Sequence, residues 1–200
     1  MFPQPDLTAL LGSRLCHDLI GPIGAIGNGV ELLTLSGSGT SDEVALIAQS
    51  VATLNARIRF FRVAFGIARP DQTLSRAEVQ SILADLHPSG RLAIDWASPA
   101  TLARIEVKAA FLCLLCAETA LRSNGHLRAL RDEVGWSVTL TSPRLRHDDG
   151  LWSRLLTPDA AGGDPLDPSE VHFPLAAAAI AALGRRPDLE PGPGWLRLSF

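Results

Sequence analysis

The stretch RLCHDLIGPIGAIGNG, residues 14–29, decides the fold because it combines a regular helical pattern with residues that disfavour a helix. Large apolar residues recur three or four positions apart through and around it: Leu11, Leu15, Leu19, Ile23, Ile26, Val30 and Leu33. This spacing predicts a helix over residues 5–34 with one apolar stripe. The same stretch carries adjacent histidine and aspartate residues, a proline and four glycines. A helix selected for stability alone would avoid such glycines and proline.

His17 lies opposite the apolar stripe of this helix. At about 100° per residue, the stripe spans roughly 120° of arc and His17 falls close to 180° from its centre. Its neighbours on the outward face are all small: Ser13, Gly21, Gly24 and Asn28. We therefore expect an exposed imidazole on a surface where small side chains leave room for another protein to dock. The alternative is that these small residues admit a packing helix.

An exposed imidazole at this position can act as a nucleophile. A free histidine side chain titrates near pH ~6.5, so a neutral ring nitrogen is available near neutrality. Asp18 can orient the ring or accept its proton as a bond forms. The sequence contains no accompanying serine, cysteine or metal-ligand arrangement. We therefore assign His17 and Asp18 as the catalytic residues of an attack on phosphorus.

A second helix follows a Ser/Gly turn at residues 36–40. Residues 40–43 have the sequence of a capping box, and Pro70 ends the helical pattern. Its apolar seam comprises Val44, Ile47, Val51, Leu54, Ile58, Phe61, Phe65 and Ala68. Two long helices joined by a short loop predict an antiparallel hairpin. We expect two copies to pair into a homodimeric four-helix bundle that covers the seam, with the chain's own second half as the alternative cover.

From about residue 71 the pattern changes to mixed helices and strands. We expect helices over 75–86, 98–123, 149–156 and 168–183, and strands over 91–96, 126–131, 135–142 and 195–200. The helix within 98–123 is apolar nearly all round between Val107 and Ala117, so we expect it to be buried. The prediction is an α+β protein with a helical hairpin at 1–69 and a small α/β sandwich at 70–200.

Charge and composition exclude several classes of function. The 200 residues carry a net charge of −3, which argues against binding nucleic acid through its phosphates. The N-terminus lacks the basic start and apolar run of a signal peptide, and no stretch has the roughly 18 apolar residues of a membrane span. Three cysteines form no disulfide framework. We expect a cytoplasmic protein that binds neither nucleic acid nor membrane.

Two further groups of residues have alternative interpretations. Cys113 and Cys116 form a C-x-x-C pair inside the apolar helix, without a second ligand pair, so core packing is favoured over a metal site. Arg14 precedes His17 by one turn, and Arg59 and Arg62 are expected level with it across the hairpin. These arginines can steady a phosphoryl group or an acidic partner pocket. Solvated surface arginines are the alternative.

The segment HDLIGP, residues 17–22, resembles the H-[ED]-x-x-x-P motif of the dimerisation and phosphotransfer domain of sensor histidine kinases. Residues 13–33 and 54–66 resemble more closely the ChpT-type histidine phosphotransferases of alphaproteobacteria, a similarity that extends over the whole chain. It implies that phosphoryl groups pass between receiver-domain aspartates through His17. The partners would be a second copy and the receiver domains of a hybrid histidine kinase and of response regulators.

The resemblance also implies that the chain holds no cofactor of its own, since the receiver supplies Mg²⁺. The expected partner-binding residues lie around His17 and across the hairpin: Ser13, Arg14, Ile20, Gly21, Pro22, Gly24, Asn28, Arg59 and Arg62.

The second half departs from an ATP-binding kinase domain. Such a domain needs an N-x-x-x-N pair on a buried helix, whose positions fall near Cys113 and Ala117, and a D-x-G-x-G motif, which the sequence lacks. The glycine pair in AAGGDP, residues 160–165, is expected to form an ordinary loop. We therefore expect a degenerate ATPase-like domain. The alternative functions are an ATP-dependent histidine kinase with an atypical nucleotide site and a scaffold that binds receivers or a kinase without carrying phosphate.

Overall fold

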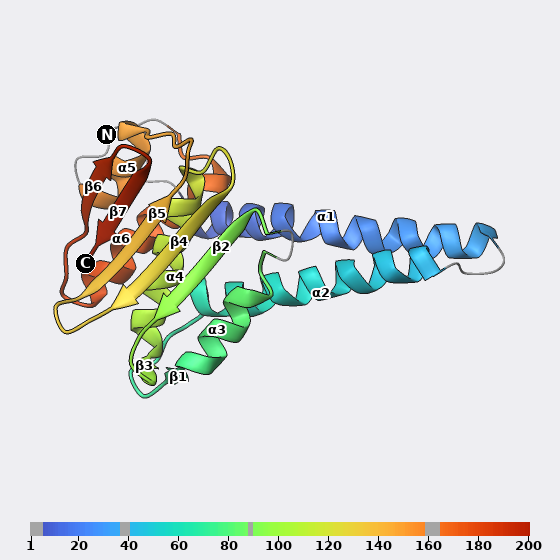
Figure 1. Cartoon of the computed structure of the whole chain (residues 1–200), viewed down its shortest axis with the longest axis horizontal. Helices are drawn as coiled ribbons and strands as arrows, with labels where there is room; N and C mark the ends of the chain where they lie inside the picture. Colours follow the sequence, from blue (N-terminus) through green and yellow to red (C-terminus); the bar gives the residue numbers. More distant parts are fainter. Residues whose placement is uncertain (1–5, 37–40, 88–89, 159–164) are drawn as a thin grey trace.

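The computed structural model describes residues 6–36, 41–87, 90–158 and 165–200. A long helical hairpin projects from an α/β unit (Figure 1). The predicted helix start at Pro5, the capping residue Thr40 and the glycine pair at 162–163 lie outside the described residues. Within those ranges, no helix combines the length and apolarity needed to cross a membrane.

Helix α1 (Leu7–Ser36) forms one arm of the hairpin. Asp6 caps its start, because one of its carboxylate oxygens accepts hydrogen bonds from the backbone N–H groups of Thr8 at 3.0 Å and Ala9 at 3.1 Å. The helix continues through Pro22 to Ser36. The first predicted helix is therefore confirmed, with its end two residues later than expected.

Helix α2 (Ser41–Ala64) forms the other arm and runs back along α1 (Figure 1). The two helices are in close contact at Gly29, where an added Cβ would lie 2.6 Å from Ile47 Cγ1. The predicted hairpin is confirmed. The prediction that α2 continues to Pro70 is wrong, because the helix ends at Ala64 and the chain turns away toward the α/β unit.

The α/β unit contains the remaining elements. Its helices are α3 (Arg76–Ala84), α4 (Arg104–Thr119), α5 (Asp149–Leu156), the 3₁₀ helix η1 (Pro168–Glu170) and α6 (His172–Ala182). Its strands are β1 (Thr73–Ser75), β2 (Leu92–Ala97), β3 (Thr101–Ala103), β4 (Gly125–Arg131), β5 (Trp136–Thr141), β6 (Asp188–Gly192) and β7 (Trp195–Ser199). Five strands form a sheet in the order β2-β4-β5-β7-β6, in which β2 and β4 are parallel and the other pairs antiparallel.

One face of this sheet is buried against helices, so the predicted small α/β sandwich is confirmed (Figure 1). Alternate residues of the central strands are fully buried, as with Leu127 and Ala129 of β4 and Val138 and Leu140 of β5. Helix α4 packs on that face, and its side chains are buried continuously from Ala109 to Ala117, as its apolar composition predicted.

Three strands were not predicted. Ser98 and Pro99 were expected to open a helix, but β3 follows them and pairs with β1, so α4 begins only at Arg104. Strand β6 contains Pro191 and Gly192, residues that weaken a strand signal, and it lies at the edge of the sheet where proline is tolerated.

Packing of aromatic side chains joins the hairpin to the α/β unit. Phe60 of α2 stacks on Phe111 of α4, with ring centroids 4.7 Å apart and planes at 9°. Lys108 Nζ donates a hydrogen bond to the Gly66 carbonyl at 2.8 Å, and Arg104 donates to the Arg62 carbonyl at 2.6 Å. The base of α2 therefore belongs to the same core as the sheet.

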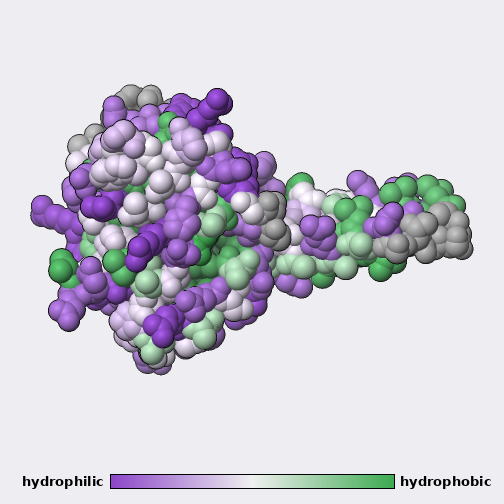
Figure 2. Space-filling model, in the orientation of Figure 1, coloured by the Kyte–Doolittle hydropathy of each residue, from purple (hydrophilic) through white to green (hydrophobic). Residues whose placement is uncertain are grey.

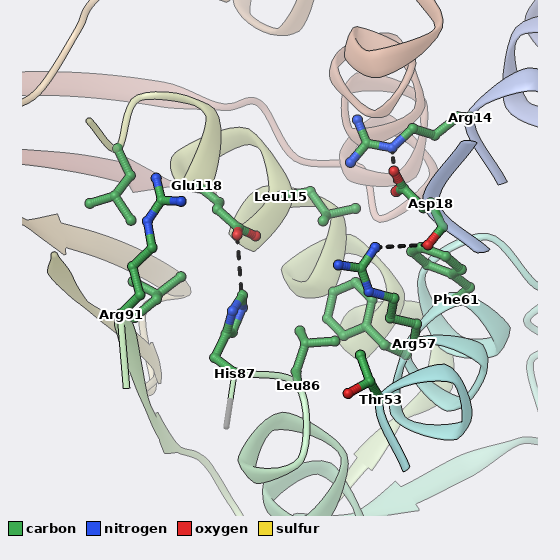
Figure 3. A pocket seen from close by; sticks show the side chains of 13 residues that line it. Arg14, Asp18, Thr53, Arg57, Phe61, Leu86, His87, Arg91, Leu115 and Glu118 are labelled. Atoms are coloured by element: carbon green, nitrogen blue, oxygen red, sulfur yellow. Dashed lines mark hydrogen bonds and ion pairs between the residues drawn. The ribbon is translucent and has the colours of Figure 1, made fainter. Parts of the chain in front are cut away.

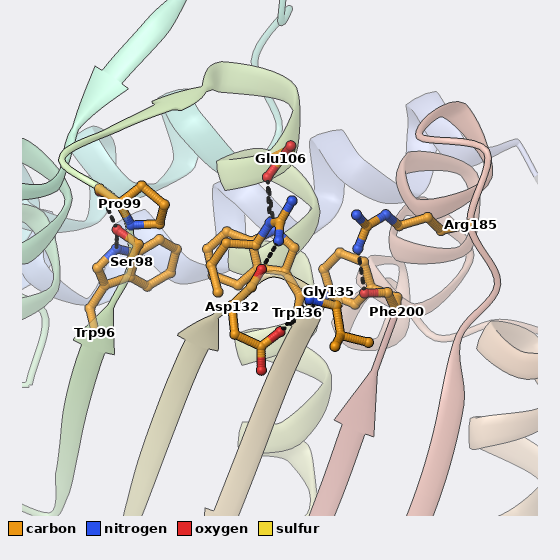
Figure 4. Close-up of polar contacts among 11 residues, drawn as sticks. Trp96, Ser98, Pro99, Glu106, Asp132, Gly135, Trp136, Arg185 and Phe200 are labelled. Atoms are coloured by element: carbon orange, nitrogen blue, oxygen red, sulfur yellow. Dashed lines mark hydrogen bonds and ion pairs between the residues drawn. The ribbon is translucent and has the colours of Figure 1, made fainter.

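Polar contacts also connect elements of the α/β unit with one another (Figure 4). Glu106 of α4 accepts hydrogen bonds from Arg131 Nε at 3.0 Å and from Trp136 Nε1 at 3.2 Å. Arg185 donates to the Phe200 carbonyl at 2.9 Å. The first two contacts join α4 to β4 and β5, and the third joins the segment after α6 to Phe200.

The projecting part of the hairpin keeps apolar side chains exposed (Figure 2). Val44, Val51 and Ile58 of the predicted α2 seam are 54%, 40% and 40% exposed, and Ile23 and Val30 of the α1 stripe are 53% and 50% exposed. The α/β unit therefore covers only the base of α2, through Phe60, Val63 and Ala64. The alternative that the chain's second half covers the whole seam is wrong.

Candidate functional site

His17 points into solvent from the middle of α1. Its side chain is 86% exposed, as the helical geometry predicted, and its Nδ1 lies 3.2 Å from Asp18 Oδ1. A neutral imidazole that donates its Nδ1–H to this carboxylate keeps the lone pair of Nε2 free and directed outward. The pair therefore presents a nucleophilic nitrogen at the molecular surface.

Asp18 is held from two sides. Its side chain is only 12% exposed, and its second oxygen accepts a hydrogen bond from Arg14 Nε at 2.6 Å, one helical turn earlier. Arg14 also donates to the carbonyl of Ser169, in η1 of the α/β unit. A series of hydrogen bonds thus runs from Ser169 of the α/β unit through Arg14 and Asp18 to the imidazole of His17. Each oxygen of the Asp18 carboxylate has one partner.

Pro22 and Arg57 complete this arrangement. Proline has no N–H, so Pro22 leaves the carbonyl four residues earlier, that of Asp18, without its helical hydrogen bond. Arg57 Nη1 of α2 donates to that carbonyl at 2.9 Å. Sequence reasoning missed Arg57, although a free carbonyl four residues before a proline inside a helix is a signal that a donor from a neighbouring helix is needed.

The surface around His17 is open. Ser13, Gly21, Gly24 and Asn28 are exposed, and Ile20 is 69% exposed. An added Cβ at Gly21 or Gly24 would meet no atom within 4 Å. These glycines are therefore not needed for packing within the chain, in contrast to Gly29.

Residues of η1 approach the same surface from the α/β unit. The pKa of Asp167 is lowered chiefly by hydrogen bonds from the side chain and backbone of Ser169, and further by the charges of Arg14 and His17. An acidic side chain from the second half of the chain therefore lies within electrostatic range of the imidazole.

The other two predicted arginines lie further along α2. Arg59 pairs with Asp85 at the end of α3 and also donates to the Ser81 carbonyl at 3.4 Å. Arg62 is exposed near the end of α2. Arg57 rather than Arg59 or Arg62 contacts the His17–Asp18 segment, and a partner-binding role for Arg59 and Arg62 stays a prediction.

Helix α4 occupies the place of the helix that carries the nucleotide-binding asparagine pair in a kinase, and most of its side chains are apolar. Cys113 and Ala117, at the expected positions, are both 0% exposed and belong to the core. Burial raises the pKa of the Cys113 and Cys116 thiols well above the usual range. Among the described residues, no group of three or more histidine, cysteine, aspartate or glutamate side chains is arranged to hold a metal ion.

Comparisons with known proteins agree over both halves of the chain. A family model for the C-terminal domain of histidine phosphotransferases matches residues 76–192. The protein phosphotransferase ChpT of Brucella abortus (strain 2308) is 54% identical over 63 residues, which are 32% of this chain and 30% of that protein. The match therefore spans less than a third of that relative. The solved structure of a bacterial phosphotransferase superposes with a TM-score of 0.82 at 27% identity, covering 100% of this chain and 99% of the other.

Proposed function

The chain belongs to the histidine phosphotransferase family, and from that premise we propose that it accepts a phosphoryl group on His17 in a cytoplasmic bacterial phosphorelay. The donor is a receiver domain carrying an aspartyl phosphate, and the acceptor is the aspartate of another receiver. The observation that carries the proposal is the 86% exposed imidazole whose Nδ1 is engaged by a carboxylate held in place by Arg14.

The proposed transfer needs only the groups of this protein and those of the receiver. The lone pair of His17 Nε2 attacks phosphorus in line with the bond to the receiver aspartate, that bond breaks, and the aspartate leaves as a carboxylate. The ring gains positive charge as the nitrogen–phosphorus bond forms, and Asp18 at Nδ1 stabilises it. The reverse sequence hands the group to the next receiver. Mg²⁺ would come with the receiver and neutralise the phosphoryl oxygens.

The receiver has room to dock over the face that carries His17. Gly21 and Gly24 keep the helix backbone bare there, and Ile20 offers an exposed apolar contact. We therefore retain Ser13, Arg14, Ile20, Gly21, Pro22, Gly24 and Asn28 as partner-binding residues, with Arg59 and Arg62 as further candidates.

The Gly24→Ala variant tests this docking face. Alanine should stabilise the free helix by up to ~1 kcal/mol, yet its methyl group should weaken receiver binding by about tenfold because it overfills a close contact. Binding of a cognate receiver is measured by isothermal titration calorimetry. Gly12→Ala is the matched control, since a Cβ there also meets nothing within 4 Å while the position lies roughly 140° around the helix from His17. Equal effects of the two substitutions would contradict the proposed face.

The alternative of an ATP-dependent kinase is not favoured. The helix positions expected to hold magnesium and triphosphate carry Cys113 and Ala117, whose side chains are buried in the core. Neither side chain offers the amide oxygen that Mg²⁺ needs.

A two-arm labelling experiment distinguishes these functions. One arm supplies γ-labelled ATP and Mg²⁺, and the other supplies a receiver domain already phosphorylated by its cognate kinase. We expect label on this protein only in the receiver arm. Labelling by ATP alone would establish a kinase. If neither arm labels the protein with any cognate receiver, the scaffold function takes precedence.

We further propose that two copies pair through the exposed stripe of the hairpin into a four-helix bundle. The support is the row of apolar side chains that the α/β unit leaves uncovered, including Val44, Val51 and Ile58. Burying such side chains is worth about 1.5–3 kcal/mol each relative to full exposure. Both copies contribute the same stripe, as a two-fold interface requires.

Val51→Glu should therefore produce a monomer. A carboxylate from each copy would be buried without a partner, raising the dissociation constant of the dimer by at least about a hundredfold. Sedimentation velocity measures the change, with Gln49→Glu on another face of α2 as the charge-matched control. A wild-type monomer, or a Val51→Glu dimer as stable as the wild type, would contradict the pairing.

A further inference from the structure

A cleft of about 470 Å³ opens between the hairpin and the α/β unit, beside Asp18 (Figure 3). Its walls come from α1, α2, the segment after α3, the start of β2 and the end of α4. The apolar part of the lining consists of Phe60, Phe61, Leu86, Leu92, Leu115 and Leu121. Polar and charged side chains form the rest of the lining: Arg14, Asp18, Thr53, Arg57, His87, Arg91 and Glu118. A cleft of this size with an apolar wall and convergent polar groups can hold a small molecule.

The polar groups of the cleft have a surplus of positive charge. Arg14 and Asp18 neutralise each other across 2.6 Å. The remaining ionisable groups are Arg57, His87 and Arg91, against the single carboxylate of Glu118. Figure 3 shows these side chains around one opening, with Arg57 on one side and Arg91 beyond His87 on the other. The cleft therefore favours an anion.

His87 has an unsatisfied hydrogen-bonding atom in this cleft. Its Nε2 is buried and has no hydrogen-bond partner among the described residues, because Glu118 Oε1 lies 3.9 Å away, beyond hydrogen-bond range. Burial is the main cause that lowers the pKa of His87, and the charges of Arg57 and Arg91 lower it further, against the opposing carboxylate of Glu118. A buried polar atom without a partner is costly, so a bound acceptor would stabilise it.

Arg91 is the second group without a partner. Within the described chain its guanidinium makes no hydrogen bond, and only its backbone carbonyl is engaged, by the N–H of Gly125 at 3.1 Å. Arg57 uses one terminal nitrogen for the Asp18 carbonyl. A guanidinium carries five N–H donors, so both arginines retain donors for a ligand.

We propose that this cleft binds a nucleoside monophosphate. Arg91, Arg57 and His87 Nε2 would hold the phosphate, since arginine matches phosphate oxygens geometrically and the histidine supplies the unused donor. The base would pack on Phe61 and Leu86, the two apolar side chains of the lining that are only partly buried, and the Phe61 ring offers it an aromatic contact. His17 is not among the residues that line the cleft, and its imidazole is directed into solvent, so the transferred phosphoryl group does not pass through the cleft.

Calorimetric titration of the full chain with AMP, GMP, adenosine and inorganic phosphate tests the site. We expect one molecule of AMP or GMP per chain, with adenosine and phosphate each at least about tenfold weaker, because each lacks half of the contacts. Arg91→Ala should weaken nucleotide binding by about tenfold or more. Arg186→Ala, which removes an exposed arginine after α6, is the charge-matched control and should leave binding unchanged.

Three results would overturn the proposal. The first is no saturable binding of AMP or GMP, and the second is phosphate binding as tightly as AMP. The third is equal affinity of wild type and Arg91→Ala. Because these measurements need neither a receiver nor transfer activity, their outcome is independent of the proposed phosphotransferase function.

Discussion

The His17→Gln variant is expected to accept no phosphoryl group from a phosphorylated receiver, a loss of at least about a thousandfold. Glutamine keeps a polar side chain of similar reach but has no nucleophilic ring nitrogen. The fold should be unaffected, because the imidazole is 86% exposed and its contact within the described part of the chain is with the neighbouring Asp18 at 3.2 Å. Exposed substitutions of this kind change stability by about 0.5 kcal/mol or less.

The measurement is transfer of label from a radiolabelled receiver, with circular dichroism of both proteins as the check on folding. His126→Gln is the matched control, since His126 is also partly exposed but lies on β4, where its Nε2 contacts Asp95 at 2.9 Å. Transfer to the folded His17→Gln variant at the wild-type rate would mean that another residue carries the group.

The Phe60→Ala variant is expected to lose about 3–5 kcal/mol of the free energy of unfolding, more than any other variant proposed above. Phe60 is 1% exposed and stacks on Phe111, so its removal leaves a cavity where α2 meets the core of the α/β unit. The hairpin and the α/β unit should lose their mutual packing first.

Urea unfolding at one fixed protein concentration, followed by tryptophan fluorescence, measures this loss. Ile67→Ala is the control, because Ile67 is 81% exposed and its truncation leaves no cavity. A Phe60→Ala variant as stable as the control would mean that the two parts of the chain fold without support from this contact.

The outward position of His17 could be predicted from sequence because it depends only on the period of one helix. The apolar stripe of α1 and the residue spacing sufficed, and the observed exposure agrees. The burial of α4 could also be predicted from sequence, since a helix that is apolar on every side lacks a polar face for contact with solvent.

The seam of α2 could be predicted only in part. The three- and four-residue spacing identified an apolar stripe, but apolar residues at the base of α2 serve a second interface. Phe60, Val63 and Ala64 face the α/β unit, while Val51 and Ile58 stay exposed. The spacing alone does not reveal which of two neighbours an apolar side chain contacts.

Contacts between distant segments were the least predictable. Arg57 reaches the Asp18 carbonyl because of the register of α1 against α2, which depends on residues across the whole hairpin. Likewise β1 and β3 are strands only because they pair with each other, and three residues each carry too little pattern to predict them. The contact of Arg14 with η1 spans 155 positions of the chain.

The central claim is that a ring nitrogen of His17 carries the phosphoryl group, and the most direct measurement locates that group. Protein labelled with ¹⁵N in histidine is phosphorylated by a receiver, kept at alkaline pH, and studied by NMR for coupling between ³¹P and ¹⁵N. The account predicts coupling to Nε2 of His17, because Asp18 engages Nδ1. Phosphorus bonded to Nδ1, or to any other residue, would contradict it.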